Sequence, residues 1–311
     1  MKVRFWGVRG SVPTPGPKTV KYGGNTACIE IRGDDDELLI IDAGTGLREL
    51  GNFLISNDLP NGPLKLNILL THTHWDHIQG FPFFGPAYIP SSIITFRGPV
   101  NAIGKKLDEI VAGQMNYSYF PIKLSELRAQ INFVEIREES FDIGSFHVST
   151  CYLNHPILCL GYRIMYKNKV IITIYDNEPY RNIFADTKKS NSSDFEDQID
   201  DEAIKEAEDY VYTQNQKILD FASGADLMIY DAQYTSEEFK TKIGWGHSTI
   251  DHAINAGIST QCKKLALFHH DPVRTDKELD TLQVQTVDKA RGLGARHMVV
   301  FFARERLEVN L

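Results

Sequence analysis

The chain has 311 residues, of which 42% are hydrophobic and 24% charged, and its formal net charge at pH 7 is −8. There is no run of eighteen apolar residues and no secretory leader pattern, so neither a membrane span nor secretion is indicated and we expect a cytoplasmic protein. There is also no basic stripe of the kind that grips the phosphates of long nucleic acid, so the charge favours a small substrate.

The cysteines indicate a reduced protein without a disulfide framework. Cys28, Cys151, Cys159 and Cys262 form no CxxC pair and no regular spacing, so we expect free structural thiols. No internal repeat or linker divides the chain, which predicts one domain over residues 1–311.

The N-terminal part predicts short apolar strands separated by glycine-rich turns. Strands are expected at Lys2 to Trp6, Ala27 to Ile31 and Leu38 to Asp42. The Gly/Pro-rich loop after the first strand contains Arg9, which we expect to be exposed, with a contact to a substrate phosphate as the alternative. The segment Asp42 to Gly46 allows a tight turn but lacks the spacing of a nucleotide-binding glycine loop.

The densest group of metal-ligand side chains follows the apolar run Leu66 to Leu70, which predicts a buried strand. His72 and His74 are two positions apart, so an extended backbone turns both rings to one side, where they can share an ion. A helix starting near Asp76 would direct that carboxylate and His77 elsewhere, toward a second ion. Without metal, several buried polar groups would each lack a partner at about 1 to 3 kcal/mol, which disfavours a purely structural role.

The segment His72 to His77 matches the HxHxDH signature of the metallo-β-lactamase-fold hydrolases, and the chain resembles this family up to about Pro272. The resemblance implies an α/β fold, an αββα sandwich formed by a single domain with surface insertions. It implies that Asp42 lies beneath the metal site as a supporting group. It further implies seven metal ligands: His72, His74 and His155 on one ion, Asp76, His77 and His269 on the other, and Asp176 between them.

The ligands of the second half follow predicted strands. His155 comes after the strand-like run Phe146 to Tyr152, and a proline directly after it favours an extended backbone. Asp176 and His269 also lie just past apolar runs. Ligands that converge on one edge of a sandwich require this placement. His270, beside the last ligand, is left open as a further supporting group.

A second motif narrows the chemistry. Gly246-His247-Ser248-Thr249 precedes a helical pattern, so Ser248 or Thr249 is expected as the cap of a helix whose N-terminus could receive an anion. A plain cap with an exposed His247 is the alternative. With Tyr230 to Tyr234, this motif resembles the phosphodiesterase branch of the family, which includes tRNA 3′-end-processing endoribonucleases and cyclic-nucleotide phosphodiesterases. The resemblance implies that His247 contacts the scissile phosphate and that Asp231 orients it.

The expected activity is therefore metal-dependent hydrolysis of a phosphodiester, with a hydroxide held by two divalent ions as nucleophile and Asp76 able to pass on a proton. Histidine and carboxylate ligands favour Zn²⁺, then Mn²⁺. A small substrate such as a cyclic nucleotide is expected, because Asp176 lies only 21 positions after His155 and tRNA-processing relatives commonly carry a long RNA-binding arm there. The alternatives are a tRNA 3′-processing-type endoribonuclease and a thiolester or lactam hydrolase.

Other segments carry weaker signals. Residues 186–209 are strongly acidic and predict a surface insertion, which we expect to be a solvated loop leading into a helix from Glu202 to Ser223; a lid is the alternative. A helix is expected at 101–115, followed by the aromatic patch Tyr117 to Pro121, which could cover a ligand or meet a partner subunit and leaves a homodimer open. The tail predicts one helix and one strand, Met298 to Phe302.

Overall fold

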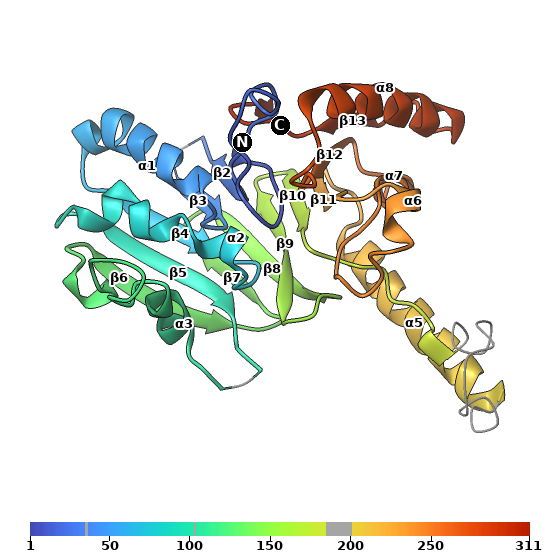
Figure 1. The fold of residues 1–311 in the computed structure, drawn as a ribbon, viewed down its shortest axis with the longest axis horizontal. Helices are drawn as coiled ribbons and strands as arrows, with labels where there is room; N and C mark the ends of the chain where they lie inside the picture. The colour runs from blue at the N-terminus through green and yellow to red at the C-terminus, as the bar shows by residue number, and fades with distance from the viewer. Residues whose placement is uncertain (35–36, 103, 185–200) are drawn as a thin grey trace.

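The computed structural model describes residues 1–34, 37–102, 104–184 and 201–311. It consists of two seven-stranded mixed sheets packed face to face, with helices on both outer faces (Figure 1). The expected αββα sandwich, formed as a single domain, is confirmed.

The first sheet has the strand order β14-β1-β2-β3-β4-β5-β6. Its strands are β1 Lys2–Gly7, β2 Cys28–Arg32, β3 Leu38–Ile41, β4 Lys65–Leu69, β5 Ile93–Pro99, β6 Gln130–Ile136 and β14 Glu308–Asn310. The pairs from β3 to β6 are parallel, and those among β14, β1, β2 and β3 are antiparallel.

The second sheet repeats this division, with the order β13-β12-β11-β10-β9-β8-β7. Its strands are β7 Ser140–Ile143, β8 Phe146–Leu153, β9 Cys159–Tyr166, β10 Lys169–Ile174, β11 Leu227–Asp231, β12 Lys264–Phe268 and β13 Val299–Phe302. The pairs from β10 to β13 are parallel, so the segments that follow these strands emerge at one edge of the sheet.

The helices form the two outer layers. They are α1 Gly46–Asn57, α2 Trp75–Ile78, α3 Leu107–Gly113, α5 Asp201–Phe221, α6 Ser236–Phe239, α7 Ile250–Ser259 and α8 Asp276–Gly292. Four short 3₁₀ turns complete the described elements: Leu59–Asn61, Phe81–Phe83, Gly85–Tyr88 and Leu124–Glu126. In Figure 1, α1 to α3 lie on one side of the sandwich, α7 and α8 on the other, and α5 extends away from the body.

Three apolar layers hold the sandwich together. The period-2 alternation of β2 sends Ile29 and Ile31 into the layer between the sheets and Cys28 into the layer beneath the helices of the first sheet. Leu47 and Leu50 of α1 join Cys28 there, while α7 covers the second sheet. The burial of apolar side chains in these three layers holds the two sheets against each other and so fixes the positions of the strand ends.

Several expectations need correction or completion. The helix expected at 101–115 begins only at Leu107, because a turn around Gly104, whose φ is +80°, precedes it.

The four cysteines are buried and free, as expected. Most of the acidic insertion lies outside the described residues; its last part begins α5, close to the predicted helix start. The homodimer that the aromatic patch left open stays untested.

Among the described helices, none has the length and apolar character that a membrane crossing needs.

Candidate metal centre

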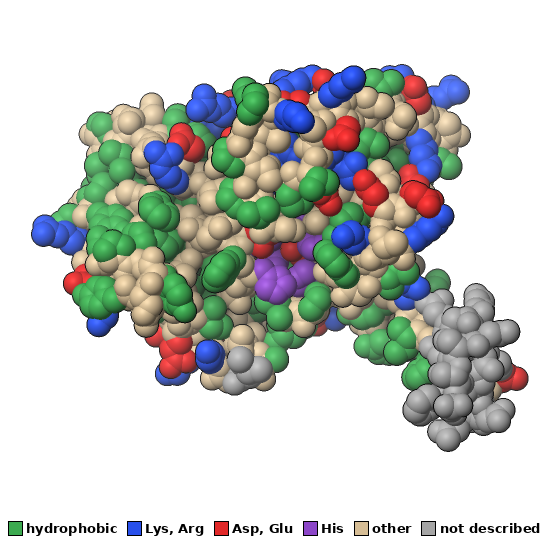
Figure 2. All heavy atoms as spheres, viewed as in Figure 1, with side chains coloured by type: hydrophobic (Ala, Val, Ile, Leu, Met, Phe, Trp, Pro, Cys, Tyr) green, Lys and Arg blue, Asp and Glu red, His purple; other side chains and the backbone are tan. Residues whose placement is uncertain are grey.

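Side chains from both sheets meet at one point where the parallel strands end. Within the described residues, they form overlapping sets whose donor atoms lie within 4.8 Å of one another: His72, His74, His155 and Asp176; Asp76, His77, Asp176 and His269; and Asp176, Asp231, His247 and His269. All seven predicted ligands, together with the predicted His247 and Asp231, are thus brought together. Figure 2 shows histidine side chains at the bottom of a hollow in the surface.

The first set has the spacing of ligands around one ion. His74 Nδ1 lies 3.0 Å from His72 Nε2 and 3.1 Å from His155 Nε2. Asp176 Oδ2 lies 3.5 Å from His72 Nε2. A tetrahedral ion with bonds of about 2.0 to 2.1 Å holds its ligand atoms roughly 3.3 Å apart. The three imidazoles and the carboxylate therefore match a tetrahedral site.

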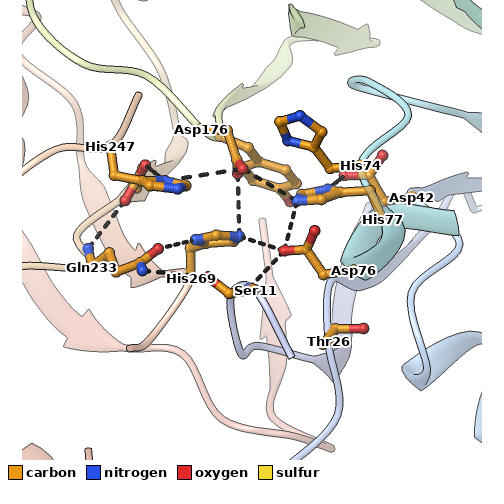
Figure 3. A network of polar contacts seen from close by, with 12 residues as sticks. Ser11, Thr26, Asp42, His74, Asp76, His77, Asp176, Gln233, His247 and His269 are labelled. Atoms are coloured by element: carbon orange, nitrogen blue, oxygen red, sulfur yellow. Dashed lines mark hydrogen bonds and ion pairs between the residues drawn. The ribbon is translucent and has the colours of Figure 1, made fainter. Parts of the chain in front are cut away.

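The second set has the same spacing and shares Asp176 with the first (Figure 3). Asp76 Oδ2 lies 3.4 Å from His77 Nε2 and 3.2 Å from His269 Nε2. Asp176 Oδ1 lies 3.3 Å from His269 Nε2. Asp176 thus reaches both sets and is placed to bridge two ions.

Two orphaned atoms test whether ions fit. His77 Nε2 and Asp176 Oδ1 are buried, yet neither has a hydrogen-bond partner in the described part of the chain. Leaving such groups unpaired costs about 1 to 3 kcal/mol each, more for a charged group. Both atoms point into the second set, where a divalent cation would satisfy them. The donor set of imidazole nitrogens and carboxylate oxygens, without a thiolate, fits Zn²⁺ or Mn²⁺.

The electrostatics of the centre also call for positive charge. Burial lowers the pKa of His72 well below its usual range. Burial acts in the same direction on His77, but the carboxylates of Asp176 and Asp76 outweigh it and raise the His77 pKa well above its ordinary value. Three carboxylates around one ring, the third from Asp42, demand a cation at that point, which a proton or a metal ion can supply.

Asp42 supports His77 from below. Its Oδ2 accepts a hydrogen bond of 2.8 Å from His77 Nδ1, which leaves Nε2 directed at the second set. Thr71 donates to the same carboxylate through its backbone N–H, at 2.8 Å from Oδ1. Asp42 is therefore placed as the resemblance implies.

A glycine turn holds His155. Its Nδ1 donates a 3.0 Å hydrogen bond to the carbonyl of Gly246, so Nε2 faces the first set. A Cβ on Gly246 would lie 2.3 Å from His155 Nδ1, and the φ of Gly246 is +84°, so this position requires glycine. The buried carboxylate of Glu178 accepts hydrogen bonds from the N–H groups of Gly244 and Gly246, at 2.8 and 3.0 Å, and fixes the turn. Sequence reasoning missed Glu178, which has no local signal.

His269 is oriented by a residue that the sequence analysis named only as part of a motif. Its Nδ1 donates to Gln233 Oε1 at 2.8 Å, which leaves Nε2 for the second set. Gly10 lets the N-terminal loop lie close to the His269 ring, because a Cβ at this position would lie only 2.3 Å from His269 Nδ1. The backbone N–H of Ser11 in this loop donates to Asp76 Oδ2 at 2.7 Å. The N-terminal loop is thus part of the centre.

Three residues at strand ends carry backbone strain. Asp42, Asp176 and His269 follow β3, β10 and β12 and take φ values of 61°, 38° and 62°. Non-glycine residues rarely adopt this left-handed region, at a cost of order 1–3 kcal/mol each, although Asp and His tolerate it better than most. Packing of the surrounding fold maintains these backbone conformations, which direct the three side chains into the centre.

His247 and Asp231 form a buried pair beside the two sets. His247 Nδ1 donates to Asp231 Oδ2 at 2.9 Å, and the ring stacks on His269 with centroids 4.9 Å apart. Burial opposes a charge on His247, but Asp231 outweighs it and raises the pKa of His247 to about 9. The contact with Asp231 therefore favours the charged form of the ring and leaves Nε2 free to donate a hydrogen bond. The alternative of an exposed His247 is wrong.

The helix after His247 is capped from within. Thr249 accepts a 3.0 Å hydrogen bond from the N–H of His252, and the N–H of Ile250 donates to the carbonyl of Tyr234. These two N–H groups at the start of α7 are thus used inside the protein. The cap is confirmed, and the start of α7 does not offer these groups to an anion.

Two further side chains differ from expectation. Arg9 is fully buried, not exposed, and its guanidinium donates to the backbone carbonyls of Gly23 and Arg274 at 2.8 and 2.7 Å. It joins distant loops and is not presented to a substrate. His270 lies outside the centre: its Nε2 meets the carbonyl of Ala303 at 2.7 Å, and its ring packs against Phe302.

A pocket of about 640 Å³ opens beside His155. Its walls come from the segment around Glu178 and from the glycine turn, with Tyr180 and Ile243 among its lining. This volume is enough for a nucleotide-sized group next to the first set.

Comparison with known proteins agrees with this geometry. Residues 22–162 match the model of the Metallo-beta-lactamase superfamily. The ribonuclease Z of Thermoplasma volcanium is 27% identical, with 89% of each chain covered. Among solved structures, the metallo-beta-lactamase fold protein YhfI from Bacillus subtilis has a TM-score of 0.65 at 15% identity, covering 99% of this chain and 98% of that one. The short form of human tRNase Z has a TM-score of 0.57 at 18% identity, covering 100% and 99%.

Proposed function

Because the chain is a hydrolase of the metallo-β-lactamase fold, we propose that it cleaves phosphodiester bonds in RNA as an endoribonuclease of the ribonuclease Z type, acting at the 3′ end of tRNA precursors. The observation that carries this proposal is the Asp231–His247 pair set against a seven-ligand donor set. A protonated imidazole beside the ions suits the developing charge of a phosphoryl group and its leaving oxygen.

The division of labour among the residues follows from their placement. His72, His74 and His155 would hold one ion, Asp76, His77 and His269 the other, and Asp176 both. Two divalent ions, for which Zn²⁺ is proposed, would lower the pKa of a bound water from 15.7 to roughly 7 and polarise a phosphoryl oxygen. His247 would donate a hydrogen bond from Nε2 to the phosphate or to the leaving oxygen.

Supporting side chains keep these groups in place. Asp231 would keep His247 charged and oriented, as a positioning residue. Asp76 accepts from the N–H of Ser11 and could take up a proton during turnover. Asp42, Gln233 and Gly246 hold three ligand rings through their second ring nitrogens, which preserves the geometry between turnovers.

The substrate expected from the sequence, a cyclic nucleotide, is less well supported than its alternative. Relatives named ribonuclease Z match this chain over 86% or more of both lengths. A long nucleic acid therefore becomes the favoured substrate despite the acidic net charge. A negative net charge does not rule out a long substrate, because base contacts and the ions themselves can also hold it.

A small cyclic phosphodiester stays the second candidate, and one observation favours it. The 21 positions from His155 to Asp176 form only a loop and the antiparallel pair β9–β10, so no RNA-binding arm projects from this part of the chain. The net charge of −8 points the same way.

A direct rate comparison separates the candidates. We would measure kcat/KM at matched metal loading on a 3′-extended tRNA precursor, on 3′,5′- and 2′,3′-cyclic nucleotides and on a thioester. The proposal predicts that the precursor exceeds each of the others at least tenfold. If kcat/KM on a cyclic nucleotide were tenfold above that on the precursor, the second candidate would take the place of the endoribonuclease. If the thioester gave the highest kcat/KM, the assignment as a phosphodiesterase would be wrong.

A further inference from the structure

Two of the three tryptophans of the chain stand in solvent beside the metal centre. Trp75 is 74% exposed and Trp245 is 55% exposed, whereas Trp6 is buried at 6%. Tryptophan carries a large apolar surface that folding normally removes from water. Two indoles left exposed next to residues of the metal centre therefore call for an explanation, such as a ligand that covers them.

Their positions in the chain tie both rings to the centre. Trp75 lies between His74 and Asp76, which both direct their side chains into the donor sets, so its indole is turned outward. Trp245 directly precedes Gly246, whose carbonyl holds His155.

The two anchor points lie close together because His74 Nδ1 and His155 Nε2 are 3.1 Å apart. One indole thus comes from the first residue of α2, which follows β4 of the first sheet, and the other from the turn that contacts His155, which follows β8 of the second sheet. His74, the neighbour of Trp75 in the chain, keeps solvent exposure at this point. Figure 2 shows hydrophobic side chains on both sides of the hollow that holds the histidines.

The orientation of one ring is fixed in advance. Lys242 Nζ lies 4.0 Å from the centroid of the Trp245 ring, in a cation–π contact. The turn that carries Trp245 is itself fixed by Glu178, whose carboxylate accepts from Gly244 and Gly246. A preordered indole loses little conformational entropy when a planar group stacks on it, and Lys242 adds a positive charge at the entrance.

We propose that Trp75 and Trp245 are stacking platforms for the two nucleobases that flank the scissile phosphate. This proposal rests on the proposed action on RNA. Every base offers a π-face, so stacking is tolerant of sequence. Because the chain has a net charge of −8, contacts to phosphates should supply a smaller share of the affinity for RNA than they do in basic RNA-binding proteins. Base stacking should then supply a larger share of that affinity.

The test compares Trp75→Ala and Trp245→Ala on a tRNA precursor and on the same precursor with an abasic nucleotide on one or the other side of the scissile phosphate. Each variant should lose about tenfold or more in kcat/KM on the normal precursor, mainly through KM. One of the two abasic precursors lacks the base that would stack on the replaced tryptophan. On that precursor, each variant should be no slower than the wild type. Trp75→Phe and Trp245→Phe should keep most of the rate.

Tyr212→Ala is the matched control, since Tyr212 is an aromatic residue of α5 that is 71% exposed, and it should change neither rate. Equal losses on normal and abasic precursors would overturn the stacking assignment in favour of a structural role. Metal content is measured in every variant, and a loss of metal would likewise overturn it.

A binding assay keeps the inference separate from the proposed function. A short single-stranded RNA should quench tryptophan fluorescence in the wild type and much less in the Trp75→Ala/Trp245→Ala double variant. If the precursor is not cleaved but this quenching occurs, the endonuclease proposal fails and the platforms stand. If the RNA causes no quenching, or the same quenching in the double variant, the platforms are wrong.

Discussion

His247 is held in place through one of its two ring nitrogens. Its Nδ1 meets the carboxylate of Asp231, which also accepts from the N–H groups of Asn177 and Gln233, at 3.3 and 3.0 Å. Asp231 is thus fixed by the backbone and in turn fixes the imidazolium. We expect the pair to act beside the ions as a hydrogen-bond donor and not as a ligand.

His247→Ala should therefore leave metal content unchanged and lower turnover of a phosphodiester about a hundredfold, as expected for the loss of one contact to developing charge. Metal analysis and kcat on the same preparation check this. Asp231→Ala should reduce kcat in the same direction, and the double variant should be little slower than His247→Ala because the two residues act as a unit. If His247→Ala lost an ion, His247 would be a ligand.

A histidine away from the ions gives the protein a predictable response to acid. Burial lowers the pKa of His252 on α7 to about 4, whereas an unfolded chain titrates near 6.5. Between these two values the unfolded state binds more protons, so the free energy of unfolding should fall as the pH drops from about 6.5 to 4. In His252→Asn this part of the loss should disappear, on the order of 1 kcal/mol between pH 7 and 5. Urea unfolding of the metal-free proteins at both pH values measures it, and an unchanged slope would contradict it.

At the residue scale, the sequence reveals the ligands better than their supports. His72 to His77 could be recognised because four ligand types lie within six positions after an apolar run. Arg9, Glu178 and Gln233 could not, because each acts through a partner more than thirty positions away. Their roles depend on tertiary packing, for which a single amino-acid sequence carries no local signal.

The strands that deliver the ligands are short buried runs, and for this reason the pattern predicted them well. β10 and β12 are mostly buried, β4 has three buried residues out of five, and all three strands are recognisable as apolar stretches. The edge strand β14 has only three residues with one buried side chain, and β6 and β7 are largely half-buried. Such elements depend on their neighbours in the sheet and give a weaker pattern.

Two glycines of one turn allow a matched test of how an element holds a ligand. Gly244 and Gly246 both have positive φ, +86° and +84°, but a Cβ on Gly244 would meet no heavy atom within 4 Å, whereas one on Gly246 would press on His155. Both alanine variants should lose roughly 1 kcal/mol or more of unfolding free energy through the backbone. Only Gly246→Ala should also lose metal from the first set and most activity. Comparable metal and activity in both variants would show that the turn does not position His155.

For the whole molecule, the ligand candidates join the two sheets. His72, His74, Asp76 and His77 follow β4 of the first sheet, while His155, Asp176 and His269 follow strands of the second. The first and second sets therefore each draw on both sheets, and an ion in either of them would act as a cross-link that the unfolded chain cannot form. Because it binds the folded state alone, it should add about 2.7 kcal/mol of stability when free metal is a hundredfold above Kd.

Removal of metal by a chelator should thus lower the Tm by several degrees, and added Zn²⁺ should restore it. Asp176→Ala, which removes the group shared by both sets, should have a low Tm that responds weakly to chelator. His147→Ala is the control, because His147 is a half-exposed residue of β8 that pairs with Asp142 outside the centre, and its Tm should respond as in the wild type. Thermal unfolding with and without chelator measures all three proteins. A full response in Asp176→Ala would mean that the stabilising ion binds elsewhere and that the sheets are held together by their apolar layer alone.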